Sequence, residues 1–378
     1  MTNTTFSPAF TKPGSQPWLC SAAFDGALII APALIASTFV ILLRPQLEGS
    51  ASLPLWAWVC FVLMVDVAHV YATLFRTYLD REAMSKNRNL LLSIPLACWI
   101  VGCLLYSVNG LLFWQALAYL AVFHFIRQQY GFMALYAFRD PEKARRFAWL
   151  DGALLYMATL YPLAYWHTHL PRNFNWFIEG DFLPVLPPMV TTIALILYIV
   201  LIGGYAVKET LVSLQTKFFN IPKNLIIFAT ASSWWAGIVL LNSDMAFTMT
   251  NVVSHGIPYM ALIWLYHRQT ATVTSKNQEG KNQEGKSIID LILKITLSYL
   301  PAFLFFLIML AYLEEGLWDG LVWREHLGFF SLFSSLPEIT DKAWLAILVP
   351  LLCLPQSTHY ILDGFIWKVK DRKRIWSA

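Results

Sequence analysis

The chain has 378 residues, of which 57% are hydrophobic and 13% charged, and its mean hydropathy is +0.54. This composition excludes a soluble domain and indicates an integral membrane protein. The formal net charge of +4 reflects basic residues between apolar segments, which is a sign of membrane topology and not of a nucleic-acid partner.

The apolar segments have the lengths of membrane-spanning helices. A hydrocarbon core about 30 Å thick needs about 20 apolar residues per helix, and the short alternating pattern of barrel strands is missing. We therefore predict an all-α, polytopic membrane protein with about ten transmembrane helices, at residues 24–43, 53–75, 90–108, 111–137, 147–166, 186–207, 222–241, 247–267, 288–313 and 343–366.

The basic residues orient these helices. With ten spans, 21 of the 27 Lys and Arg residues fall on one side, and basic residues accumulate in cytoplasmic loops. We therefore predict that both termini are cytoplasmic and that the protein lies in the inner (plasma) membrane of a bacterium. The segment before the first span contains one basic residue, Lys12, and no clear cleavage site, so we expect the first helix to be retained.

The chain is predicted to form a single integral membrane domain over residues 1–378. Helices one to eight occupy 24–268, and the last two helices with a basic cytoplasmic tail occupy 288–378. Between them, a five-residue polar unit is written twice from residue 275 onwards, which predicts a flexible cytoplasmic linker at 269–287.

Four histidines stand singly inside predicted helices, each with a second polar side chain three or four residues away. Such spacing puts both side chains of a pair on one helix face. The pairs are Asp66/His69, His124/Gln128, Asn251/His255 and His359/Asp363, with Gln356 on the face of the last pair.

The predicted topology gives these histidines a depth. All four helices run from outside to inside, and at 1.5 Å per residue His69 and His359 lie about 24 Å deep and His124 about 20 Å deep. These three therefore share a level in the cytoplasmic leaflet. His255 comes out nearer the middle, about 12 Å deep, although Pro258 could bend its helix, so the sequence leaves open whether His255 belongs with the others.

Ionisable groups inside a membrane normally face the bundle interior and mark a functional site. Imidazole with carboxylate suits iron, zinc or manganese, so we predict a transition-metal centre, with iron as the first choice. Gln128 and Asn251 would orient water or substrate, and Arg127 would bind an anionic group or reach the cytoplasmic surface. The predicted ligands are His69, His124, His255 and His359, with Asp66 and Asp363 as further ligands or as hydrogen-bond partners of the histidines.

The predicted function is that of a metal-dependent membrane enzyme, a non-haem iron oxidoreductase acting on a lipophilic small molecule that enters from the lipid bilayer. A zinc centre would instead generate hydroxide. Three alternatives stay open: two imidazoles that ligate a haem, a transporter or proton relay that uses the same His and Asp residues, and interhelical hydrogen bonds without chemistry.

Other polar residues have plainer interpretations. Asp25, Asp151 and Lys294 are expected to be charges at the membrane boundary that reach water. His167 and His169 lie in a predicted outer loop and are weak metal candidates.

The placement of the histidines resembles that in desaturase-type membrane di-iron enzymes, which also gather histidines at the cytoplasmic ends of helices, although this chain lacks HxxxH and HxxHH clusters. Single histidines on separate helices are also similar to bacterial membrane oxygenases that cleave β-carotene. Both likenesses concern the scattered histidines alone, so neither assigns a role to a residue of this chain.

Overall fold

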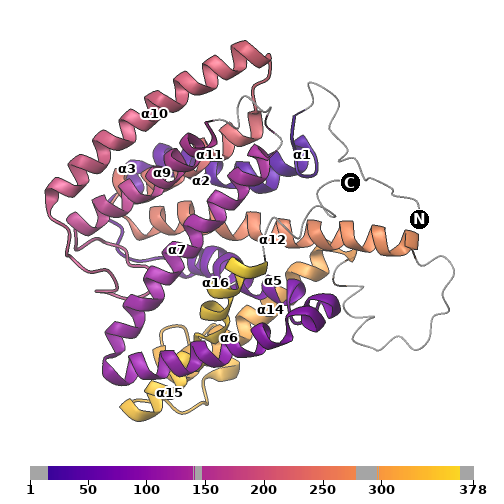
Figure 1. Cartoon of the computed structure of the whole chain (residues 1–378). Coiled ribbons are helices and arrows are strands. Elements are labelled where there is room, and N and C mark those ends of the chain that lie inside the picture. Colours follow the sequence, from indigo (N-terminus) through magenta and orange to yellow (C-terminus); the bar gives the residue numbers. More distant parts are fainter. Residues whose placement is uncertain (1–15, 139, 141–146, 278–295, 297, 367–378) are drawn as a thin grey trace.

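The computed structural model describes residues 16–138, 140, 147–277, 296 and 298–366 (Figure 1). Within these residues every regular element is a helix, which confirms the all-α class. The elements are α1 (Ala22–Asp25), η1 (Gly26–Ile30), α2 (Ala31–Leu42), α3 (Arg44–Leu47), α4 (Leu55–Ala57), η2 (Trp58–Val67), α5 (Ala68–Arg76), α6 (Arg81–Val108), α7 (Gly110–Ala137), α9 (Ala148–Thr168), α10 (Pro188–Thr216), α11 (Ile221–Trp234), η3 (Trp235–Leu240), α12 (Asp244–Asn277), α14 (Leu300–Trp318), η4 (Asp319–Trp323), η5 (Ser331–Phe333), α15 (Lys342–Leu352) and α16 (Leu354–Ile366).

Seven helical segments of the described chain are long and apolar enough to cross a membrane, which supports a polytopic membrane protein. The bent pair α15 and α16, with an angle of 44° between them, would make an eighth. Helices α9 and α12 cover two further predicted spans but are not among these candidates, so the number of ten spans and the side of the termini stay predictions. The seven segments are Ala22–Leu42, Leu55–Arg76, Arg81–Val108, Gly110–Ala137, Pro188–Thr216, Ile221–Leu240 and Leu300–Trp323.

Helix boundaries follow from local capping. Asp80 accepts a hydrogen bond from the Ala83 N–H at the start of α6, and Asn109 accepts one from the Leu111 N–H at the start of α7. Each cap satisfies a backbone donor that the first helical turn leaves open. Asn109 is extended, with φ −162°, so the chain reverses between α6 and α7 within a single residue.

Helix α12 passes through the middle of the molecule and packs against α2, η2, α5, α11 and η3 (Figure 1). Helix α10 lies on the outside of α9, and α6 lies on the opposite side of the molecule against α15 and α16. Only 11% of the most apolar part of α6, and of α10, is buried in the protein. These two helices therefore present apolar faces that a bilayer would cover.

All four π-helical segments in the described chain, η1, η2, η3 and η4, lie inside or at the end of candidate spans. Segment η2 ends directly before α5, the helix of His69. A π-helical turn carries extra residues relative to an α-helix and is frequent at functional sites. The extra residues also rotate the next helical turn about the axis, so the α-helical periodicity used in the sequence analysis does not hold between Asp66 and the residues before it.

The structure corrects the interpretation of Asp25 and Asp151 as boundary charges that reach water. Asp25 is fully buried and accepts hydrogen bonds from the backbone N–H groups of Leu19 and Cys20 and from the Tyr136 hydroxyl. It thereby fastens the segment before α1 to α7. Lys294 lies outside the described residues.

Asp151 belongs to a buried ionic network between α9, α10 and α11. Lys208 contacts Asp151 and Glu209 at 2.6 Å each, and Lys223 contacts Asp140 at 2.9 Å, Glu209 at 2.8 Å and Asp151 at 3.5 Å. All five side chains are buried. Both lysines were counted as cytoplasmic charges in the topology prediction, yet their side chains are paired inside the protein.

The segment between α12 and α14 differs in part from the predicted linker at 269–287. Helix α12 continues to Asn277, so the first nine residues of that range are helical, because a helix that is already formed is easier to extend than to start. The rest of the linker, most of the repeat and the predicted start of the next span at 288–295 lie outside the described residues.

Candidate metal centre

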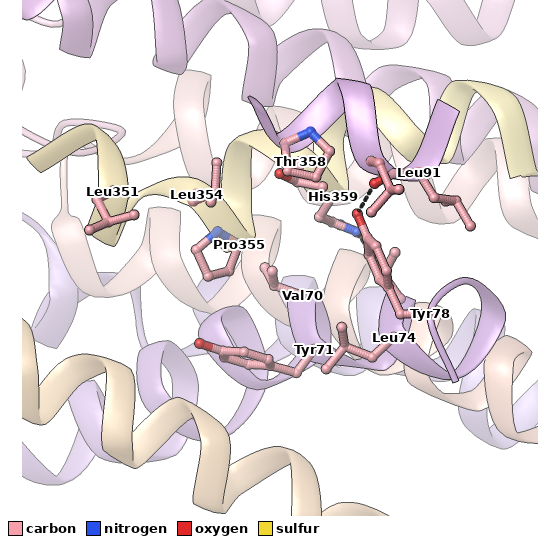
Figure 2. A pocket seen from close by; sticks show the side chains of 13 residues that line it. Val70, Tyr71, Leu74, Tyr78, Leu91, Leu351, Leu354, Pro355, Thr358 and His359 are labelled. Carbon is pink, nitrogen blue, oxygen red and sulfur yellow. Dashed lines mark hydrogen bonds between the residues drawn. The ribbon is translucent and has the colours of Figure 1, made fainter. Parts of the chain in front are cut away.

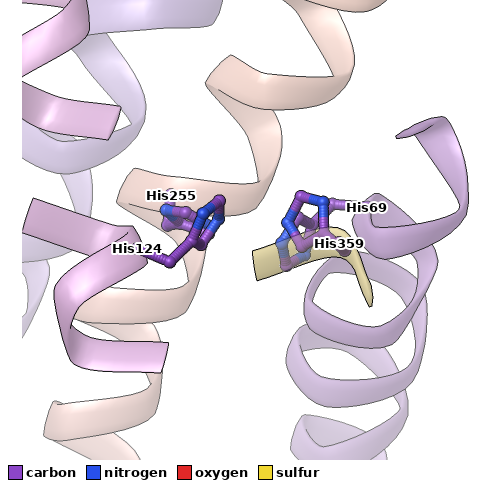
Figure 3. A group of neighbouring side chains, drawn as sticks. All are labelled: His69, His124, His255 and His359. Carbon is purple, nitrogen blue, oxygen red and sulfur yellow. The ribbon is translucent and has the colours of Figure 1, made fainter. Parts of the chain in front are cut away.

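The side chains of His69, His124, His255 and His359 come together in one buried cluster. Each offers one ring nitrogen such that these four atoms lie within 4.8 Å of one another. Figure 3 shows the pair His124 and His255, from α7 and α12, facing the pair His69 and His359, from α5 and α16. All four residues are at most 2% exposed.

The rings are arranged edge to face around a common point. Ring centroids are 4.4 Å apart for His124 and His359, 4.7 Å for His69 and His255, and 5.0 Å for His69 and His359. The Nε2 atoms of His124 and His255 are 3.1 Å apart. The ring of His255 also stacks on Phe125, with centroids 3.6 Å apart and an interplanar angle of 7°, which fixes its plane.

The open question about His255 is thereby resolved, since it lies as close to the centre as the other three. The depth estimate of about 12 Å assumed parallel, straight helices that all start at the same level. The structure instead starts α12 at Asp244 and places Pro258 inside it. Axial shifts and tilts between helices bring His255 level with the others.

Three ring nitrogens of the cluster have no hydrogen-bond partner among the described residues: Nε2 of His69, Nδ1 of His255 and Nε2 of His359. A buried polar atom without a partner costs about 1–3 kcal/mol, and native proteins rarely leave one without a reason. Three such atoms in a single cluster form a set of lone-pair donors, which is what a metal ion requires.

The outer nitrogens of three histidines, by contrast, are held by the protein. Nδ1 of His69 lies 3.2 Å from the Val65 carbonyl, and Nδ1 of His359 lies 2.6 Å from the Thr73 hydroxyl. Nδ1 of His124 lies 3.5 Å from Oδ2 of Asp363. When Nδ1–H donates outward in this way, the lone pair of Nε2 points at the centre, as in metal-bound histidines generally.

A chain of polar contacts joins two of these outer nitrogens. The Thr73 hydroxyl, which contacts His359, also lies 3.0 Å from the Tyr259 hydroxyl, and Tyr259 donates to Oδ1 of Asp363 at 3.1 Å. The other carboxylate oxygen of Asp363 lies within ion-pair distance of Nδ1 of His124. Helical spacing paired Asp363 with His359, but its carboxylate lies against His124 of α7, and the Thr73 hydroxyl contacts His359 instead.

The sequence analysis missed Thr73 and Tyr259, although a signal for both was present. Thr73 stands four residues after His69, and Tyr259 stands four residues after His255. Each therefore shares a helix face with a cluster histidine. A single hydroxyl group is a common feature of membrane helices, so the residue type alone does not mark Thr73 or Tyr259 as part of a site.

Substitution Asp363→Asn tests the support given to His124. We expect a loss of metal affinity of about 10–100-fold, because a neutral amide orients and polarises an imidazole less well than a carboxylate. Metal competition with a chromophoric chelator measures it. Asp66→Asn is the matched comparison and should cost less, since the Nδ1 atom of His69 already contacts a carbonyl; an equal loss would contradict the assignment.

Helix α7 supports the cluster through two adjacent glutamines. Pro258 has no N–H, so the Ser254 carbonyl, four residues earlier in α12, loses its helical donor. The Gln129 amide donates to that carbonyl at 3.2 Å, and the Gln128 amide donates to the His255 carbonyl at 2.9 Å. Gln128, predicted to orient water or substrate, thus holds the backbone that carries His255.

Gly256 permits the close approach of α12 to η2. A methyl group at this position would lie 2.7 Å from a side-chain carbon of Val65, 3.0 Å from the Val65 carbonyl oxygen and 3.4 Å from Nδ1 of His69. The backbone oxygen cannot move without moving the helix. The distance between His255 and His69 therefore depends on the absence of a side chain here.

Accordingly, Gly256→Ala should weaken metal binding by about tenfold or more and destabilise the fold by about 1–3 kcal/mol, the usual cost of overpacking. Metal titration and the Tm in detergent report the two effects separately. Gly131→Ala in α7 is the control, because a methyl group there would meet no atom within 4 Å. Equal metal affinity in both variants would show that this approach does not set the cluster geometry.

The other predicted site residues lie further from the centre. Asp66 is about one-third exposed, and its carboxylate is 3.8 Å from Nδ1 of His69, on the outer side of that ring. Asn251 donates to the Phe247 carbonyl of its own helix at 3.2 Å. Neither belongs to the group whose atoms converge, so the histidines alone form the candidate ligand set.

Of the two environments predicted for Arg127, an anionic partner is not seen among the described residues. Its side chain is exposed, and its guanidinium donates to the Tyr156 hydroxyl of α9 at 2.6 Å. That Arg127 reaches the cytoplasmic surface stays a prediction. The arginine contacts the aromatic surface of α9, with Tyr130 below it at 5.1 Å.

The ninth span predicted from the sequence ends at residue 313, and the next residue, Glu314, was not singled out. Helix α14 continues through Glu314, which is 5% exposed. It accepts hydrogen bonds from the Tyr71 hydroxyl at 2.6 Å and from the amide of Gln356. Gln356 was predicted to share a helix face with His359. Its amide instead donates to Glu314 of α14.

His167, His169 and His326 have ordinary partners. His167 contacts the Leu163 carbonyl and the Tyr119 hydroxyl, and His169 contacts the Tyr165 carbonyl. His326 stacks on Trp58. No contact joins these residues to the cluster in the described part of the chain, and they remain weak candidates for metal binding.

The cluster has the chemistry and nearly the size of a mononuclear metal site. Zn–N bonds are about 2.0–2.1 Å long, so four nitrogens around a tetrahedral ion lie about 3.4 Å apart. The nitrogens of the cluster are up to 4.8 Å apart, so the side chains would move inward by up to about 0.9 Å to bind such an ion. Four imidazoles without thiolates suit zinc, copper, iron or nickel, and the donor set does not select one of them.

Comparison with known proteins adds no family to this picture. No protein-family model matches the chain, and no curated protein or solved structure shows significant similarity to it. Any function proposed for the chain therefore rests on the histidine cluster and its surroundings.

Proposed function

We propose that the protein is a membrane-embedded, metal-dependent oxidoreductase. A non-haem iron ion, held by His69, His124, His255 and His359, would activate dioxygen for the oxidation of a lipophilic substrate from the bilayer. The observation that carries the proposal is the convergence of four buried imidazoles, three of which have a ring nitrogen without a hydrogen-bond partner among the described residues.

The surroundings favour iron over zinc for this function. Zinc supplies hydroxide for attack on polarised carbonyl or phosphoryl groups, and such substrates need polar side chains to orient them. A cavity of about 570 Å³ reaches His359, and its lining holds no charged side chain. Dioxygen and a lipophilic substrate both suit such surroundings. The protein would contribute ligand geometry, exclusion of water and an apolar binding surface.

The haem alternative conflicts with the geometry. Two axial imidazoles lie on opposite faces of a porphyrin, and the macrocycle occupies the plane between them. Here the other two imidazoles occupy that space, since all four nitrogens lie within 4.8 Å. A haem would require two of the four histidines to move out of the centre.

Metal analysis of the protein, purified in detergent after expression with iron, zinc, copper and manganese supplied, tests the proposal. We expect about one equivalent of metal per chain and dioxygen consumption that depends on iron. Less than a tenth of an equivalent of any transition metal would overturn the proposal. A Soret band would support the haem alternative, and solute flux into proteoliposomes without turnover would support the transporter alternative.

A further inference from the structure

The cavity beside the cluster is bounded by α5, α6, α15 and α16 (Figure 2). His359 and Thr73 line it, so it meets the histidine cluster at the ring of His359. Its volume of about 570 Å³ lies within the range of pockets that enclose a single small ligand, about 300–1,000 Å³.

The cavity opens on a surface that a bilayer would cover. Leu92 of α6 and Leu351 of α15, which both belong to its lining, are 52% and 44% exposed. Helix α6 also exposes Leu96 (55%) and Leu104 (63%) on its outer face. A molecule dissolved among lipid chains could therefore reach the cavity without crossing a polar surface.

The polar groups of the wall are almost all engaged. The Tyr71 hydroxyl donates to Glu314, the Thr73 hydroxyl contacts His359, and the Tyr78 hydroxyl donates to the Leu91 carbonyl at 2.7 Å. The hydroxyl of Thr358 has no nitrogen or oxygen partner among the described residues, but it is buried in the wall and interacts with the Cys98 thiol. No lysine or arginine lines the cavity, so a phosphate or carboxylate would have no charged partner inside it.

A hydrogen bond next to Pro95 connects α6 to the segment after α5 at the wall of the cavity. Pro95 has no N–H, so the Leu91 carbonyl, four residues earlier in α6, lacks its helical donor. Tyr78 supplies the replacement from the segment after α5. This hydrogen bond fixes the distance between α6 and the end of α5, and hence the width of the cavity between them (Figure 2).

From these observations we infer that the cavity is the entry and binding site for one uncharged, single-chain lipid. The chain enters from the bilayer between α6 and the α15–α16 pair, and its end or middle comes to rest against the ring of His359. The inference rests on the proposed function, because it supplies the substrate for the same metal centre.

Photolabelling tests the inference on the full-length, metal-loaded protein in detergent. The probe is a sixteen-carbon fatty alcohol that carries a diazirine and an alkyne, and labelled peptides are identified by mass spectrometry. We expect labelling on α5, α6 and α16, and weaker labelling by the matching fatty acid and by a diacyl phosphatidylcholine with the same diazirine. Stronger labelling by either of those would overturn the uncharged, single-chain assignment.

Two tryptophan variants locate the site. Leu354 lines the cavity, so Leu354→Trp should fill it and reduce labelling by about tenfold or more. Leu104→Trp adds the same ring to the exposed face of α6 outside the lining and should leave labelling unchanged. Equal labelling in the two variants, or labelled peptides outside the cavity, would overturn the inference.

Metal content is measured on the same samples, so that a failure of the lipid site can be distinguished from a failure of the metal centre. Bound metal with labelling that is insensitive to Leu354→Trp would overturn the lipid site and leave the metal centre intact. Specific labelling of the cavity in a protein that binds no metal would overturn the proposed function, while the lipid site would stand as a binding site alone.

Discussion

Replacement of any one cluster histidine by alanine is expected to reduce bound metal from about one equivalent to less than a tenth. Each imidazole supplies one of only four converging nitrogens. Loss of a hydrogen-bond partner of a ligand already costs about 10–100-fold in affinity, so loss of the ligand itself should cost more. The variants are His69→Ala, His124→Ala, His255→Ala and His359→Ala, measured by elemental analysis after gel filtration.

His167→Ala is the matched control for these variants. His167 is also buried and hydrogen-bonded, but its partners are Tyr119 and Leu163. It should retain the metal content of the unaltered protein. Full metal content in a folded His255→Ala variant would restrict the site to three ligands, and full content in all four variants would eliminate it.

Metal removal should also lower the Tm of the unaltered protein, because an ion that binds only the folded state stabilises it by about 2.7 kcal/mol at 100 times its Kd. The cluster variants, which no longer bind the ion, should show no such response to a chelator. A chelator-dependent Tm in His359→Ala would indicate that the ion is held elsewhere.

Substitution Lys223→Met should destabilise the fold by about 3–5 kcal/mol, the cost of breaking a buried ion pair from one side. Lys223 is 1% exposed and contacts three carboxylates, those of Asp140, Asp151 and Glu209. Without it, Lys208 would be the remaining lysine, among the described residues, in contact with Asp151 and Glu209. A methionine of similar length fills the space but supplies no positive charge.

The free energy of unfolding, from denaturant titration in mixed micelles, measures this loss. Lys217→Met, at an exposed lysine near the same end of α10, should change it by less than about 0.5 kcal/mol. Addition of Asp151→Asn to Lys223→Met should recover part of the loss, because one uncompensated charge is removed. A stability unchanged in Lys223→Met would show that the network is not a determinant of the fold.

The sequence by itself determined the all-α class and the approximate positions of the helices, because the thickness of hydrocarbon fixes the length of an apolar helix. It also singled out the four histidines that converge. An isolated imidazole on an apolar helix is costly to expose to lipid, so each was expected to face the bundle interior. The comparison of depths grouped three of them correctly, and the fourth required the structure.

Which residues support the histidines was decided by the tertiary structure alone. Helical spacing paired Asp363 with His359, whereas the fold places its carboxylate against His124 and gives Thr73 to His359. Spacing specifies which residues share a face of one helix. It does not specify how that helix is rotated, tilted and shifted against its neighbours, and the π-helical turns of η2 alter the face before His69 is reached.

The same limit explains the charged residues that were misplaced. Asp151, Lys208 and Lys223 lie near predicted helix ends, where a charge can either reach water or meet an opposite charge from a neighbouring helix. Only the packing of α9, α10 and α11 brings them together and buries them. The chain's composition and periodicity therefore determine what must be buried, whereas the contacts between helices decide which buried groups meet.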